Sequence, residues 1–112
     1  MEKIIYIGDR PVKFKSTGAT LLRYKLQFQR DMLTDLLRLE KAINNNDELN
    51  VSNIDLELFY NLLWTFAKTA DKSIEPPLEW LDTFDEFPIF DIIPELQDLI
   101  FSNFKTTNTS KN

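Results

Sequence analysis

The chain opens with an apolar segment and a segment of alternating apolar and polar positions, which together predict two short strands. Residues 3–7 are mostly β-branched or aromatic, and residues 12–15 alternate apolar side chains with lysine. The composition of residues 3–7 favours a strand, and the period of two in residues 12–15 is typical of a half-exposed strand. Gly8-Asp9-Arg10-Pro11 between them has the residue types of a turn. We therefore predict a β-hairpin over residues 3–15, which must pack on helices or pair with another chain, because a lone hairpin is marginally stable.

A long helix is predicted to follow, with Ser16 or Thr17 as its N-cap and its end near Asn44. Its apolar residues recur in steps of three or four, so they form one continuous stripe that faces a core. The residues of this stripe are Leu21, Tyr24, Phe28, Met32, Leu36, Leu39 and Ile43.

A second apolar stripe lies about 120° around the same predicted helix. It consists of Leu22, Leu26, Leu33 and Leu37. The two stripes together make an apolar arc that is wider than a single surface helix needs. Either two neighbouring elements of the same subunit cover this helix, or the second stripe contacts another subunit or a client protein. The pattern alone leaves both interpretations open.

The rest of the chain is predicted to contain shorter helices separated by polar or proline-containing breaks. They are residues 54–71, residues 78–84, and a last helix that has Asp91 as its N-cap. Ser52 with Asp55 approximates a capping box before the first of these helices. Trp64 lies off the apolar stripe of that helix, so its ring either completes the edge of the core or anchors a contact.

These elements predict an α+β fold that is mainly α, with an N-terminal β-hairpin followed by about four helices. A length of 112 residues suits one domain with one core. We place this single domain at residues 1–104. Residues 105–112 are small and polar, and they are expected to form a flexible tail.

The residue types that the sequence lacks exclude several classes of function. The sequence has no cysteine and no histidine, so thiolate or imidazole ligands and the usual acid–base side chain near neutral pH are excluded. With only two glycines, no glycine-rich phosphate loop is possible. We expect a protein that is not an enzyme and that has no cofactor or metal. No signal peptide and no membrane-spanning run is recognised, so a soluble intracellular protein is expected.

Charge is divided unevenly along the chain, although the total is only −5. Residues 1–43 contain nine bases and five acids, a net charge of +4, whereas residues 73–104 contain eight acids and no base, a net charge of −8. The two regions either face each other or are solvated within one subunit, or they join subunits head to tail. A third interpretation is that the acidic region imitates a nucleic-acid backbone. Binding of nucleic acid itself is disfavoured by the overall acidity.

Three residue strings and the order of the elements resemble a known family. The strings are 58–68 (LFYNLLWTFAK), 80–87 (WLDTFDEF) and 89–96 (IFDIIPEL). They follow a short hairpin and a long predicted helix, and the run from Trp80 to Leu96 carries most of the likeness. Over about residues 3–104, the chain resembles the tail assembly chaperones encoded by long-tailed phages and prophages of Gram-positive bacteria.

The resemblance implies a chaperone that coats the long tape measure protein before the tail tube polymerises. Such a protein keeps its helical client soluble, recruits tail tube protein, acts in the host bacterial cytoplasm and is absent from the mature virion. The family also makes a longer form by translational frameshifting, and its members tend to self-associate, so a homo-oligomer is expected. No nucleic-acid or membrane partner is implied.

Candidate residues for the protein-interaction surface come from the second stripe and the two tryptophans. They are Leu22, Leu26, Leu33, Leu37, Trp64 and Trp80. The alternative function is an acidic phage-encoded inhibitor or DNA mimic that binds a basic host protein through the −8 region. Asp82, Asp85 and Glu86 would be central to that activity.

Overall fold

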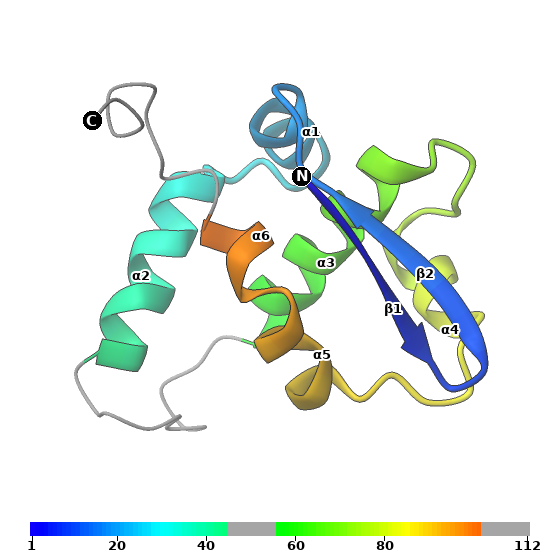
Figure 1. The fold of residues 1–112 in the computed structure, drawn as a ribbon. Helices are drawn as coiled ribbons and strands as arrows, with labels where there is room; N and C mark the ends of the chain where they lie inside the picture. Colours follow the sequence, from blue (N-terminus) through cyan, green and yellow to red (C-terminus); the bar gives the residue numbers. More distant parts are fainter. Residues whose placement is uncertain (45–55, 102–112) are drawn as a thin grey trace.

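The computed structural model describes residues 1–44 and 56–101. In chain order its elements are β1 (Glu2–Ile7), β2 (Arg10–Lys15), α1 (Thr20–Phe28), α2 (Met32–Asn44), α3 (Leu56–Ala70), α4 (Pro77–Asp82), α5 (Ile89–Glu95) and α6 (Gln97–Phe101) (Figure 1). The predicted fold class is confirmed, since a hairpin precedes a mainly helical region. The described residues form six helices rather than about four, because two of the predicted helices are each divided. The predicted tail, residues 105–112, lies outside the described residues.

The hairpin forms because its turn and its inner face both suit this backbone. Gly8 has a φ of 66°, a conformation that glycine adopts without steric cost and that a two-residue hairpin turn requires at its first position. The strands pair antiparallel, with Ile5 opposite Val12. The inner-face side chains Ile5, Ile7, Val12 and Phe14 are buried, and β2 lies along α3. The opposite face of the hairpin is exposed.

The single helix predicted over residues 17–44 is wrong, because the chain breaks between α1 and α2. Gln29 takes the left-handed conformation, with φ 58° and ψ 34°, and its backbone N–H donates to Lys25 O at 2.8 Å, which ends α1. Asp31 then accepts a hydrogen bond from the backbone N–H of Leu33 at 3.1 Å, satisfying a free donor at the start of α2. The break changes the direction of the chain although no glycine or proline marks it.

The N-cap predicted for this helix is also wrong. Helix α1 has Ala19 as its N-cap and no side-chain cap. Thr17 instead shapes the preceding turn, since its Oγ1 accepts from the N–H of Ala19 at 3.2 Å and its own N–H donates to Thr20 Oγ1 at 2.9 Å. The two threonines therefore stabilise the turn that precedes α1, and neither of them acts as the N-cap of the helix.

The C-terminal helices begin and end at positions that differ from the prediction. Helix α4 starts with Pro77, as proline in a first turn allows. The last predicted helix is divided at Leu96 into α5 and α6, and Asp91 lies in the first turn of α5, whose N-cap is Pro88. Pro94 lacks the N–H that would bond to the turn before it, so α5 ends one residue later.

The centre of the core is α3, which Figure 1 shows between the hairpin, α1 and the C-terminal helices. The prediction of a helix over 54–71 is confirmed as Leu56–Ala70, while the Ser52/Asp55 cap lies outside the described residues. Ten of its fifteen residues are buried, as expected of a helix that is covered on most sides. From the predicted core stripe of residues 21–43, Tyr24, Met32, Leu36 and Leu39 are buried, and Leu21 and Phe28 pack against the core.

Candidate protein-interaction site

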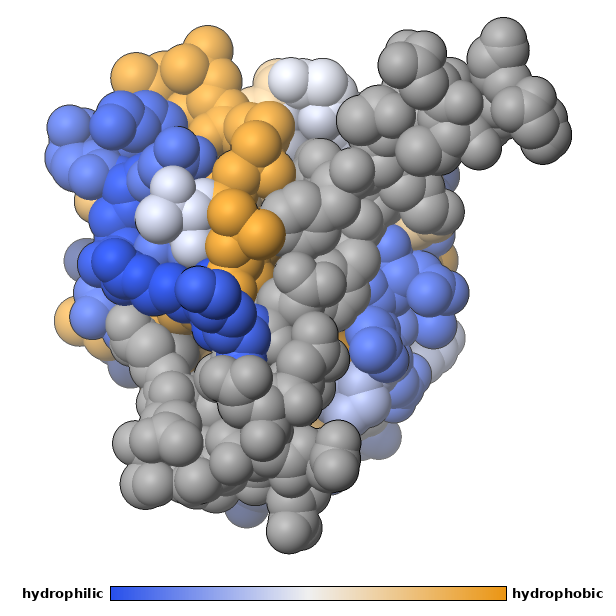
Figure 2. Space-filling model, turned by 90° about the vertical axis from the view of Figure 1, so that its left-hand side faces the viewer, coloured by the Kyte–Doolittle hydropathy of each residue, from blue (hydrophilic) through white to orange (hydrophobic). Residues whose placement is uncertain are grey.

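The break at Gln29 divides the second leucine stripe between two helices. Leu22 and Leu26 lie on α1 and are 60% and 67% exposed. Leu37 lies on α2 and is 52% exposed, whereas Leu33 is half-buried. On the face that carries α2, apolar side chains reach the surface beside a band of hydrophilic ones (Figure 2). The four leucines therefore do not form the single helical stripe that the sequence predicts.

Leu22 and Leu26 together line a shallow groove between α1 and α3. The lining residues are Ala19, Leu22, Arg23, Leu26, Gln27, Trp64 and Lys68, and the groove holds about 330 Å³. The structure thus brings three of the six predicted interaction residues to one place and leaves Leu33, Leu37 and Trp80 outside it. A hollow this open to solvent suits the side of another helix better than it suits an enclosed small molecule.

Trp64 belongs to the wall of this groove, although its side chain is mostly buried. Its indole N–H donates to the backbone O of Glu75 at 2.9 Å. Its ring also meets Phe28 edge to face, with ring centroids 5.7 Å apart. Both interactions fix the ring, so Trp64 is a rigid part of the groove lining, but with only 3% of it exposed it offers a partner little surface of its own.

Cationic groups border the same groove. The guanidinium Nε of Arg23 is buried and has no hydrogen-bond partner within the described ranges 1–44 and 56–101. Lys68 Nζ lies 5.9 Å from the centroid of the Trp64 ring and donates to Lys72 O and Ile74 O at 2.7 and 3.0 Å. The groove therefore joins an apolar wall to a positive border, which suits an apolar helix face flanked by acidic residues.

Trp80 occupies a different part of the molecule and is a core residue. Only 1% of it is exposed. Its ring packs edge to face on Phe84 and Phe87, at centroid distances of 5.1 and 5.7 Å. The hairpin closes over this cluster, because Arg10 lies 4.1 Å from the centroid of the Phe84 ring. The expectation that Trp80 contributes to a contact surface is not supported by this position, since the side chain offers almost no surface to a partner.

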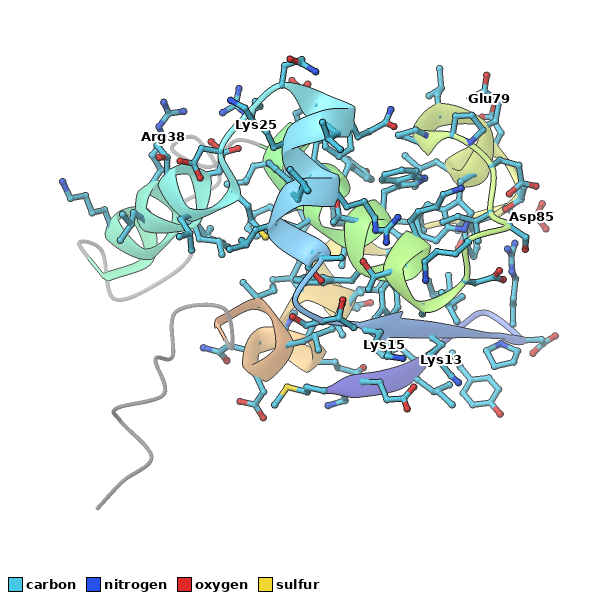
Figure 3. All side chains as sticks on the ribbon, turned by 90° about the horizontal axis from the view of Figure 1, so that it is seen from above. Lys13, Lys15, Lys25, Arg38, Glu79 and Asp85 are labelled. Atoms are coloured by element: carbon cyan, nitrogen blue, oxygen red, sulfur yellow. The ribbon has the colours of Figure 1, made fainter. Side chains whose placement is uncertain are left out.

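The two charged regions of the sequence are separated only in part, because Arg10 of the basic region lies in the acidic one, where its Nη1 donates to Thr83 Oγ1 at 2.8 Å. Figure 3 shows Lys25 and Arg38 on one side and Glu79 and Asp85 on the opposite side. All eight acids of residues 73–104 are exposed. Within the parts of the chain that the structure describes, the ion pairs are Lys13–Glu2, Arg30–Asp35 and Arg38–Asp35, and none includes one of the eight. These exposed carboxylates therefore form no direct ion pair with a base in the described part of the subunit.

A buried polar cluster at the junction of α1 and α2 was missed by the sequence analysis. Asp35 is buried and accepts a hydrogen bond from the Tyr24 hydroxyl at 2.7 Å, and its two carboxylate oxygens accept from Arg30 Nε and Nη2, each at 2.8 Å. Burial alone would raise the pKa of Asp35, but the hydrogen bonds and charge of Arg30, with help from Tyr24, hold that pKa below its ordinary value. Burial, together with Asp35, raises the pKa of Tyr24.

The described residues contain neither a candidate metal site nor a membrane-spanning helix. Among them, no group of three or more aspartate and glutamate side chains is placed to share a metal ion. No helix in this part of the chain is both long enough and apolar enough to cross a bilayer. None of Tyr24, Arg30 and Asp35 lines any of the three grooves described on this surface, so we interpret the Asp35 cluster as a structural brace between α1 and α2.

Comparisons with protein-family models, with curated proteins and with solved structures find no match for this chain. The functional interpretation therefore depends on its own residues, and on the resemblance carried by residues 58–68 and 80–96.

Proposed function

We propose that this chain is a non-enzymatic phage tail assembly chaperone that acts in the host bacterial cytoplasm and is not part of the mature virion. Its client is the tape measure protein, which it binds and keeps soluble, and it helps to recruit tail tube protein. The observation that carries the proposal is the groove between α1 and α3, where Leu22 and Leu26 are exposed beside the rigid ring of Trp64.

The chemistry of the groove suits a helical client. Burial of a leucine side chain contributes about 1.5–3 kcal/mol, so two partly exposed leucines give a contact that is weak enough to be reversed. The positive border formed by Arg23 and Lys68 adds preference for a helix with acidic residues beside its apolar face. Many such contacts along a long client would hold it soluble by multivalency.

The double substitution Leu22→Asp and Leu26→Asp tests this proposal. We expect the variant to lose binding of a helical tape measure fragment by about a hundredfold or more, because two apolar contacts are replaced by charges. The measurement is the soluble yield of the co-expressed fragment, together with its affinity by calorimetry. The folded state is expected to change little, since both side chains are exposed.

The control is Leu37→Asp, which places one aspartate on an exposed leucine outside the groove. It is expected to bind the fragment as the unmodified chain does. If the double variant keeps the client soluble, or if Leu37→Asp is the variant that fails, the groove is not the client surface.

A second candidate function is supported by the eight exposed carboxylates of residues 73–104. An acidic inhibitor or DNA mimic would use them to bind a basic, nucleic-acid-handling host protein. The triple substitution Asp82→Asn, Asp85→Asn and Glu86→Gln distinguishes the two functions. We expect it to leave solubilisation of the tape measure fragment unchanged. Loss of a tight, salt-sensitive complex with a basic host protein would instead support the inhibitor.

A further inference from the structure

The free edge of β1 differs from the free edge of β2, and the difference follows from the pairing. Met1 and Ser16 exchange backbone hydrogen bonds, with N–O distances of 2.9 and 3.4 Å. In an antiparallel pair, bonded and non-bonded positions alternate. The backbone N–H and C=O groups of Lys3, Ile5 and Ile7 therefore point toward β2. Those of Glu2, Ile4 and Tyr6 point away from the sheet.

The outward-pointing groups of β1 have no backbone partner in the parts of the chain that the structure describes. Figure 3 shows β1 as the outermost element on its side of the molecule, with β2 between it and α3. The side chains of Ile4 and Tyr6 are 55% and 68% exposed. A β-branched and an aromatic residue on an open edge are the features of a strand that accepts another strand.

The edge of β2 lacks these features. Its outward-pointing positions are Pro11, Lys13 and Lys15, which are the partners of Tyr6, Ile4 and Glu2 in the register. Proline has no N–H to donate, and lysine is a residue that natural proteins place on edges to discourage pairing. Of the two edges of this hairpin, only that of β1 is open to strand addition.

We propose that β1 pairs antiparallel with β1 of a second copy of this chain, which joins the two hairpins into one four-stranded sheet. The outward-pointing groups are arranged symmetrically about Ile4. In a twofold arrangement centred there, Ile4 faces Ile4 of the second copy and Glu2 faces Tyr6 of the second copy. This register uses all three outward-pointing residues of each strand, and every such pair exchanges two backbone bonds.

The side chains of β1 are compatible with pairing between two copies of the strand in this register. In the same register Lys3 faces Ile5 of the second copy, so no two like charges are directly opposed. A sheet of two strands is at the lower limit of stability, and extension to four strands removes the open edge from both subunits. This inference goes beyond the proposed function, because it concerns contacts between copies and uses none of the groove residues.

The test begins with the mass of the full chain in solution, measured by light scattering over a range of concentration. We expect a species of twice 13.2 kDa, and amide exchange measured by NMR should identify its interface. The amides of Ile4 and Tyr6 should be protected in the dimer and unprotected on dilution, whereas those of Ile5 and Ile7 should be protected in both states. A monomer at every concentration, or a dimer in which Ile4 and Tyr6 exchange freely, would overturn the proposal.

Substitutions on the two edges provide a matched pair. Ile4→Pro removes an N–H that the hairpin does not use, so we expect a folded monomer. Lys13→Pro makes the same change directly opposite, on the edge of β2, and should leave the dimer intact. If Ile4→Pro fails to fold, Ile4→Lys gives the same answer by placing two ammonium groups opposite each other. A dimer that survives Ile4→Lys, or protection of Tyr6 only when a client peptide is added, contradicts pairing between copies.

Discussion

Replacement of Trp80 with alanine is expected to lower the free energy of unfolding by about 3–5 kcal/mol. The side chain is the largest fully buried one in the described residues. Its removal would leave a cavity beside Phe84 and Phe87, and it would loosen the aromatic cluster on which Arg10 rests. Urea unfolding followed by circular dichroism measures the change.

The control for Trp80 is Leu78→Ala on the same short helix. Leu78 is 70% exposed, so its truncation is expected to change the free energy of unfolding by no more than about 0.5 kcal/mol. If Trp80→Ala is as stable as this control, the ring is not part of the core, and its role in a contact surface has to be considered again.

Loss of the Asp35 carboxylate is the second change with a large expected effect. Asp35→Ala leaves the Tyr24 hydroxyl without its acceptor and separates Arg30 from its two-oxygen partner. Breaking a buried ion pair costs about 3–5 kcal/mol, and we expect the lower end of this range because Arg30 reaches solvent. Asp98→Ala, which removes an exposed carboxylate, is the control and should change the free energy of unfolding little.

The same carboxylate makes stability depend on pH in a defined direction. The pKa of Asp35 is lower in the folded protein than its ordinary value of 3.8, so the unfolded chain takes up the proton first as the pH falls. The contribution of Asp35 is therefore complete above that value and is lost as the pH drops through the folded pKa. We therefore expect the free energy of unfolding to fall less between neutral pH and about pH 3 in Asp35→Ala than in the unmodified chain. An equal fall in the two proteins would contradict this assignment.

The fold class could be predicted because its signals are local. The β-branched and aromatic composition of residues 3–7, the period of two in residues 12–15 and the steps of three or four in residues 54–71 each match an observed element. The division between α1 and α2 could not be predicted in this way. Its left-handed residue is a glutamine, and the buried stripe of Tyr24, Met32 and Leu36 keeps helical spacing across the break.

The Asp35 cluster was missed for a related reason. Arg30 and Asp35 are five residues apart, a spacing that does not bring two side chains together on a continuous helix. The turn at Gln29 makes their contact possible, so the ion pair is visible only once the break is known. A lone aspartate in an amphipathic pattern gives no sign that it will be buried.

The candidate site could be predicted in part. The second stripe contains Leu22 and Leu26, which are exposed, but the pattern could not show that α3 contributes Trp64 and Lys68 to the same groove. Burial of the tryptophans was equally hidden, because a residue off the main stripe of α3 or α4 becomes buried only when other elements cover that side. Tertiary packing, and not periodicity, decides both outcomes.

Pro11 has a consequence for the size of any assembly built on the hairpin. A subunit able to accept a neighbour on two sides would add copies without end, and the product would be a fibre. With a proline on one side of the hairpin, growth by this route ends after a single addition. The molecule can then be made at high concentration inside a cell with little risk of ordered aggregation through its sheet.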